Sequence, residues 1–137
     1  MATTVAENLR RGDLLAEACP SRSVLKHLTS RWGVLVLIVL QSGTHRFSEL
    51  RKKIGGVSER MLAATLQGLE NDGMVLRTDH HEVPPRVDYR LTSLGCESAE
   101  KVAALADWIE ESLPKIAKHW TAPAIRPSSG RSRAGVS

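Results

Sequence analysis

The sequence predicts a mostly helical α+β domain, and three patterns carry this prediction. Two helical segments flank Gly55-Gly56, two short strands follow them, and a long helix with an apolar stripe comes last. A chain of 137 residues can form one domain with a real core. We expect that domain over residues 19–120, an N-terminal arm over 1–18, and a disordered basic tail over 121–137 that is rich in proline, serine and glycine.

The first helix of the domain is expected to begin at Pro20 or Ser21, because proline suits the first helical position. Its inner face should carry Val24, Leu25 and Leu28. The apolar run VLVLIVL that follows is too short to span a bilayer. Its lack of alternation favours a buried central helix over residues 32–41, although a strand is the competing interpretation because valine and isoleucine are frequent. A very short strand is possible over residues 44–47.

Residues 47–54 should form a helix that Gly55-Gly56 ends, because glycine supplies the left-handed conformations of a helix C-terminus. Ser58 is placed to cap the next helix. On that helix Leu62, Leu66 and Leu69 form a buried face. The opposite, polar face carries Arg60, Ala64, Gln67 and Asn71. Two helices around a glycine-containing turn form the helix-turn-helix pattern, whose second helix enters the DNA major groove.

The charge of this region supports a nucleic-acid partner. Residues 46–60 hold five basic and two acidic residues, a net charge of +3, within a chain of net charge +4. A solvated amphipathic helical hairpin is the alternative. The next segment favours DNA binding: residues 74–79 and 86–92 read as two strands, and Pro84-Pro85 lies in their connection. A helix-turn-helix followed by a hairpin is a winged helix-turn-helix, here with a two- or three-stranded wing.

The last helix should begin after a Thr92 cap and extend over about 93–119. Trp108 lies off its main apolar stripe, so a second subunit is expected to cover part of it. Pro114 predicts a kink or a break. The stripe consists of Val102, Leu105, Ala106, Ile109, Leu113, Ile116 and Trp120. The fold therefore has extra N- and C-terminal helices that we expect to form a dimer.

These residues resemble the HxlR family of bacterial regulators, within the MarR-like winged helix-turn-helix group. The resemblance covers about residues 19–108 and is most specific at the wing, where VPPRVDYRLTSLG is similar to the family pattern PPRVxYxLTxxG. Other matching pieces are Cys19-Pro20, the segment WGVLVLIVL, and Arg46-Phe47-Ser48-Glu49-Leu50. The remaining matches are Ser58 with Arg60-Met61-Leu62, Leu66, Leu69-Glu70 and Asp72-Gly73.

The resemblance implies a transcription factor, most often a repressor, that binds a pseudo-palindromic operator as a homodimer in the bacterial cytoplasm. It implies a dimer contact through the N- and C-terminal helices. Several members sense oxidants or electrophiles through the cysteine that matches Cys19. The tail beyond Trp120 is not a family feature, and the resemblance does not define a role for Cys96.

Candidate DNA-binding residues come from three places. Arg60 can pair with a guanine edge or hold a phosphate, and Gln67 can pair with adenine. Arg86 can contact DNA or form a salt bridge within the hairpin. The full set is Ser48, Arg51, Lys52 and Lys53, then Ser58, Glu59, Arg60, Ala64 and Gln67, then Arg77, His80, His81 and Arg86 in the wing.

Cys19 precedes the first helical residue, where the helix dipole favours a thiolate, so it is a candidate redox sensor. The alternative is a small buried apolar residue. Cys96 is the only other cysteine with which it can pair. We expect no metal at His80-His81, because adjacent residues on a strand point to opposite faces, and no cofactor.

Two other classes compete with a thiol-sensing regulator. An enzyme is not expected, because the sequence contains no nucleophile elbow, glycine-rich phosphate loop or zinc-protease pair. A winged-helix module for protein assembly would bind DNA without regard to sequence, or not at all. Within the regulators, a small-molecule sensor with an apolar pocket near the dimer helices is the alternative.

Overall fold

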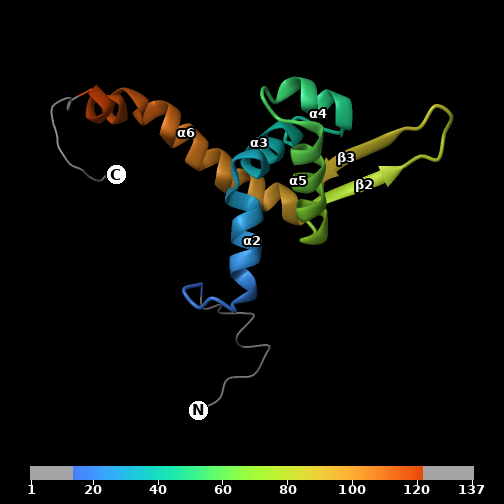
Figure 1. The fold of residues 1–137 in the computed structure, drawn as a ribbon, viewed down its shortest axis with the longest axis horizontal. Coiled ribbons are helices and arrows are strands. Elements are labelled where there is room, and N and C mark those ends of the chain that lie inside the picture. Colours follow the sequence, from blue (N-terminus) through green and yellow to red (C-terminus); the bar gives the residue numbers. More distant parts are fainter. Residues whose placement is uncertain (1–13, 122–137) are drawn as a thin grey trace, which may run out of the picture. The chain divides into compact units, whose positions relative to one another are not determined.

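The computed structural model describes residues 14–121 and has the mostly helical α+β architecture that the sequence predicts (Figure 1). The arm over 1–18 lies largely outside the described residues, and the tail lies outside them from residue 122 onward. The elements in chain order are α2 (Pro20–Thr29), α3 (Arg31–Leu40), β1 (His45–Arg46), α4 (Phe47–Lys53), α5 (Glu59–Asn71), β2 (Val75–Asp79), β3 (Val87–Leu91) and α6 (Ser93–Thr121).

Helix α2 begins at Pro20, as predicted. Val24 and Leu28 pack against the core, but the prediction for Leu25 is wrong, because its side chain is 43% exposed. Leu25 lies about 100° around the helix from Val24, at the edge of the face that Val24 and Leu28 share. The apolar run is helical, not a strand.

Helix α3 provides the centre of the core. Val36 and Leu37 are fully buried and Leu40 nearly so. The helix is not buried on every side, since Leu35 is 38% exposed. No single described helix is long and apolar enough to cross a membrane; α2 and α3 reach that composition only as a pair bent by 69°.

The helix pair α4 and α5 packs on α3 through apolar side chains. Leu50 of α4 and Leu62 and Leu69 of α5 are fully buried. Ser58 caps α5 as predicted, because its hydroxyl accepts a hydrogen bond from the Met61 N–H at 3.1 Å. The predicted helix-turn-helix is therefore present and is anchored by its apolar side.

The wing is a three-stranded antiparallel sheet in the order β1-β3-β2. Strand β3 pairs with β2 from Val75 opposite Leu91 to Asp79 opposite Val87, and with β1 where His45 faces Tyr89. The hairpin of β2 and β3 extends away from α5 (Figure 1). His80 and His81 follow the end of β2, so they lie in the connection and not on a strand as the sequence interpretation assumed.

Helix α6 begins at the predicted cap: the Thr92 hydroxyl accepts a hydrogen bond from the Gly95 N–H at 2.9 Å. A Cβ atom at Gly95 would collide with the Met74 carbonyl, which explains the glycine there. The helix continues through Pro114 to Thr121, so the predicted break does not occur at that proline, and a kink remains the alternative. Pro114 and the residue four before it, Glu110, are both exposed, and water can bond the carbonyl that the proline leaves without a donor.

The chain divides after Ala103 into two compact units. In the first, Ala99 and Val102 of α6 belong to the core. The rest of α6 forms the described part of the second unit, and five of its large apolar side chains are exposed. They are Leu105, Trp108, Ile109, Leu113 and Trp120.

Candidate DNA-binding interface

Helix α5 presents one buried apolar face and one exposed polar face. Leu62, Leu66 and Leu69 are at most 2% exposed, as the sequence pattern predicts. The outward positions Arg60, Ala64, Gln67 and Asn71 are all exposed. The face is short-chained at its centre because of Ala64, which permits close approach to a broad surface. Its chemistry fits the edges of bases, which guanidinium and amide groups read by paired hydrogen bonds.

Hydrogen bonds order part of this face before any partner arrives. The Gln67 side-chain N–H donates to the Asn71 side-chain oxygen at 3.0 Å, one helical turn away. Glu59 stands in the first turn of α5, where a carboxylate favours the positive end of the helix dipole. Its Oε2 accepts from Arg51 at 3.3 Å, so it acts within the protein. Sequence reasoning placed Glu59 among DNA-facing residues without identifying this partner.

The cations of α4 differ in how they are held. Arg51 reaches the turn, with its Nε 3.5 Å from the Val57 carbonyl, and joins α4 to the start of α5. Lys52 is exposed, as is Ser48 at the other end of the helix. The Lys53 ammonium lies 2.8 Å from Nε2 of His45 on β1. Sequence reasoning missed His45, because nothing in the local pattern links a strand residue to a lysine eight positions later.

A hollow of about 430 Å³ separates α4 from the start of α5. Its walls combine the aromatic ring of Phe47 with the charged side chains of Arg51, Lys52 and Glu59. The other lining residues are Ser48 and Val57. Two of the predicted cations, Arg51 and Lys52, therefore lie beside the start of α5.

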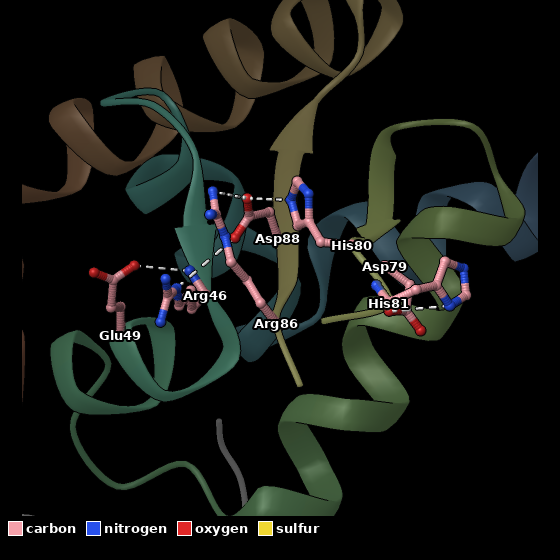
Figure 2. A network of polar contacts seen from close by, with 7 residues as sticks. All are labelled: Arg46, Glu49, Asp79, His80, His81, Arg86 and Asp88. Carbon is pink, nitrogen blue, oxygen red and sulfur yellow. Dashed lines mark hydrogen bonds and ion pairs between the residues drawn. The ribbon is translucent and has the colours of Figure 1, made fainter. Parts of the chain in front are cut away.

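The wing contains a polar cluster centred on Asp88 of β3 (Figure 2). Its Oδ2 accepts from His80 at 2.8 Å and from Arg86 at 3.2 Å, and its Oδ1 lies 4.0 Å from the Nε of Arg46. These bonds hold the pKa of Asp88 below its ordinary value, chiefly through His80 and then through Arg86. The Arg86–Asp88 pair is the within-hairpin salt bridge that the sequence left as an alternative.

Two details of the wing modify its expected role. The Nε of Arg86 is buried and has no hydrogen-bond partner among the described residues. His81 adopts a positive φ of 53°, and its backbone N–H donates to Asp79 at 2.9 Å, which lowers the pKa of that carboxyl. Arg77 is exposed on β2. Three predicted wing residues are thus already engaged with acids, and Arg77 is the more accessible cation.

Cys19 is the N-cap residue of α2, the position that the sequence predicts. Its side chain is half-buried and makes no capping hydrogen bond. Cys96 is exposed in the first turn of α6, and no disulfide joins the two cysteines. Within the described residues, no group of three or more histidine, cysteine or acidic side chains is arranged to hold a metal.

The geometry is that of a helix-turn-helix with a wing, and comparison with known proteins identifies the family. The model of the HxlR-like helix-turn-helix family matches residues 27–117. The chain belongs to this family. It is a DNA-binding transcriptional regulator and not an enzyme, as the sequence predicts.

Relatives and solved structures agree with this assignment. The uncharacterized HTH-type transcriptional regulator YtfH of Escherichia coli K12 is 61% identical over 113 residues, which are 82% of this chain and 90% of that protein. The solved structure of ytfH from Salmonella typhimurium is 60% identical, has a TM-score of 0.77, and covers 80% of this chain and 97% of that one. The redox regulator HypR in its reduced form is 30% identical, with a TM-score of 0.66 and coverage of 72% and 98%.

Proposed function

We propose that the protein is a dimeric, sequence-specific repressor that places α5 in the major groove of each half of a pseudo-palindromic operator. The outward face of α5 carries this proposal. Arg60 and Gln67 lie exposed on one side of a helix whose other side is buried. Arg60 donates to guanine or to a phosphate, and Gln67 pairs with adenine. Repression follows because a dimer on a promoter excludes the polymerase.

The remaining contacts hold the DNA backbone. Ser48, Arg51, Lys52 and Lys53 on α4 are exposed beside α5 and bind phosphates, which sets the register of the reading helix. Arg77 of the wing adds a further cation, while the Asp88 cluster engages His80 and Arg86 and limits the charge that the wing contributes. Most of the electrostatic attraction to the DNA phosphates therefore comes from α4.

Fluorescence anisotropy of the full-length reduced protein tests sequence-specific binding. The probes are the duplex upstream of the protein's own gene, a duplex selected by the protein from a randomised library, and a scrambled duplex of equal length. Salt is held at a stated value, because phosphate contacts make affinity steeply salt-dependent. The proposal predicts a preference for the selected duplex on the order of a thousandfold. Equal weak binding to all three duplexes would instead favour a protein-assembly module.

Dimerisation is proposed through the N- and C-terminal helices. Trp108 and Trp120 are more than half exposed, at 57% and 69%, and Leu105 is 51% exposed. Ile109 and Leu113, between them along the helix, are exposed as well. Monomeric proteins rarely expose large apolar patches, so a second copy of the chain is the occupant that we propose. A symmetric dimer also explains how two copies of α5 meet two half-sites.

We further propose that Cys19 is a redox sensor. The thiol stands at the N-cap of α2, where the helix dipole favours the thiolate, and HypR, a relative of 30% identity, is a redox regulator. The thiolate attacks one oxygen of a peroxide; the O–O bond breaks, the other oxygen leaves as water or an alcohol, and the sulfur becomes a sulfenic acid. A second thiol then displaces water from the sulfenic acid and forms a disulfide. In a Cys19→Ser variant the oxidant should no longer release DNA, while binding under reducing conditions stays unchanged. Release that persists in Cys19→Ser, but not in Cys96→Ser, would contradict the assignment.

A ligand-sensing regulator is the second candidate. The surface of α2 has a hollow of about 550 Å³ lined by Arg22, Ser23, Leu25, Lys26 and Thr29. Its lining is cationic at two positions, which differs from the apolar pocket that the sequence interpretation considered. A response to a small molecule that is retained in Cys19→Ser would favour this candidate.

A further inference from the structure

A contact between α2 and α5 holds the C-terminal end of the helix that we propose enters DNA. Nδ1 of His27, in the last turn of α2, lies 2.6 Å from Oδ2 of Asp72. Asp72 is the C-cap residue of α5, and its side chain is only 14% exposed. The hydrogen bond is therefore largely shielded from water, and it joins residues 45 positions apart in the chain.

The position of Asp72 explains why it needs such a partner. A carboxylate at the C-terminus of a helix faces the negative end of the helix dipole, which is unfavourable. The N–H of the His27 imidazole offsets this by placing a donor beside the carboxylate. Among the described residues, His27 is the side-chain hydrogen-bond partner of the Asp72 carboxylate. Asp72 therefore fixes the position of the helix end through its hydrogen bond to His27, although its carboxylate alone would not stabilise that end.

The His27 ring also lies directly on the backbone of α5. A Cβ atom at Gly68 would be 3.0 Å from Cδ2 of His27 and 3.2 Å from its Nε2. Gly68 is buried in the interior of α5, where glycine lowers helix stability relative to alanine. The missing side chain leaves the space that the ring occupies. The last turn of α5 is therefore held at two points, by ring contact at Gly68 and by a hydrogen bond at Asp72.

His27 itself lies at a close-packed corner between α2 and α3. The Ser30 hydroxyl donates to the His27 carbonyl at 3.2 Å and accepts from the Gly33 N–H at 3.1 Å. A Cβ atom at Gly33 would collide with that same carbonyl, so α2 and α3 meet as closely as their backbones allow. The corner of α2 and α3 thus provides a fixed reference point for the end of α5.

Each of the two residues at the end of α5 that His27 contacts comes directly after a residue of the outward face. Gln67 precedes Gly68 and Asn71 precedes Asp72, and both Gln67 and Asn71 are exposed and joined by a hydrogen bond. We propose that His27 is a positioning residue for DNA recognition, which fixes the C-terminal half of α5 through Gly68 and Asp72 so that Gln67 and Asn71 meet their bases. This inference rests on the proposed reading role of α5.

A double-mutant cycle between His27 and Gly68 tests the proposal. Gly68→Ala adds a methyl group beneath the ring. His27→Asn keeps a side-chain N–H near the position of Nδ1 for Asp72 but removes the ring. Affinity of the full-length protein is measured on the library-selected duplex and on its scrambled counterpart, at one salt concentration. Gln41→Ala, at the exposed end of α3, is the control for loss of a polar side chain outside α5.

Gly68→Ala should lower the selected-to-scrambled affinity ratio about tenfold, the size of one base contact, and leave binding to the scrambled duplex within about twofold. In the His27→Asn background the same substitution should have no further effect, because the ring that it displaces is gone. Gln41→Ala should leave the ratio unchanged. A purely structural role would instead lower the affinities for both duplexes together, along with the melting temperature, and would overturn the proposal.

The failures of the two proposals are distinguishable. A wild-type protein without preference for the selected duplex overturns the reading role of α5 and this inference with it. A wild-type preference that Gly68→Ala and His27→Asn leave intact, or reduce by independent factors, overturns only the role of His27. In the second case α5 still reads DNA, and the contact with α2 does not set its position.

Discussion

Lys53 of α4 donates a hydrogen bond to Nε2 of His45, which is 94% buried on β1, at 2.8 Å. The other ring nitrogen of His45 lies 2.7 Å from the Gly43 carbonyl. Because a carbonyl only accepts, Nδ1 carries the proton and Nε2 offers its lone pair to the ammonium. A buried neutral histidine thus fixes the position of a cation at the edge of the proposed DNA-binding surface.

Substitutions at His45 should separate the two functions of its ring. His45→Gln keeps an acceptor near the position of Nε2, whereas His45→Asn keeps only the donor to Gly43. We predict that His45→Asn weakens DNA binding about threefold to tenfold, as expected for loss of order at one phosphate contact, and that His45→Gln largely retains it. Anisotropy titrations on one duplex provide the measurement. Equal losses in both variants would show that the Lys53 contact is irrelevant to binding.

The salt dependence of binding should count Lys53 among the phosphate contacts. Lys53→Ala should reduce the slope of log affinity against log salt by about one. Lys52→Ala is the matched control for a neighbouring exposed lysine and should give a similar reduction if both hold phosphates. A slope that Lys53→Ala leaves unchanged would mean that its ammonium serves His45 alone.

Asp88 predicts a loss of stability in acid. Its folded-state pKa lies below its ordinary value because of His80 and Arg86. The stabilisation is therefore complete above the unfolded-state value near 4 and is lost as pH falls through the lower folded-state pKa. Between about pH 5 and about pH 3, wild-type protein should lose more urea resistance than Asp88→Asn. The control is Asp107→Asn on α6, which should behave as wild type; identical acid profiles for wild type and Asp88→Asn would contradict the prediction.

The exposed apolar side of α6 predicts a dimer. Ile109→Glu introduces a charge where we expect the second copy to pack, so the variant should be a monomer at micromolar concentration by light scattering. Its affinity for the selected duplex should fall on the order of a hundredfold, because the two half-sites no longer bind as one unit. Lys115→Glu adds the same side chain at an exposed polar position and should remain a dimer. A wild-type monomer would contradict the prediction outright.

Local patterns explain how much of the fold the sequence reveals. The leucines of α5 repeat at helical spacing, and the strand residues Val87, Tyr89 and Leu91 alternate, so both elements and their buried sides are predictable. The caps at Ser58 and Thr92 are predictable for the same reason, since capping acts within three residues. These features identify the winged helix-turn-helix without any knowledge of tertiary contacts.

The contacts that organise the site are not local, and the sequence does not reveal them. His27 meets Asp72 across 45 positions, and Arg46 of β1 lies beside Asp88 of β3 although the two are far apart in the chain. Spacing along the chain contains no information about such pairs. The same limit explains the wrong placement of Leu25. The sequence shows that Leu25 is apolar, but it does not show whether another element covers its side chain.

We propose that the outward face of α5 reads base sequence in two symmetric half-sites. The most direct test is to sequence the duplexes selected from a randomised library by the wild-type protein and by Gln67→Ala, with Thr65→Ala as the control on the same helix. Wild type and Thr65→Ala should both select a palindromic site. With Gln67→Ala, base preference should relax at one position in each half, at a cost of about 1–3 kcal/mol per contact. Identical selected sites from wild type and Gln67→Ala, or no enriched site at all, would contradict the claim.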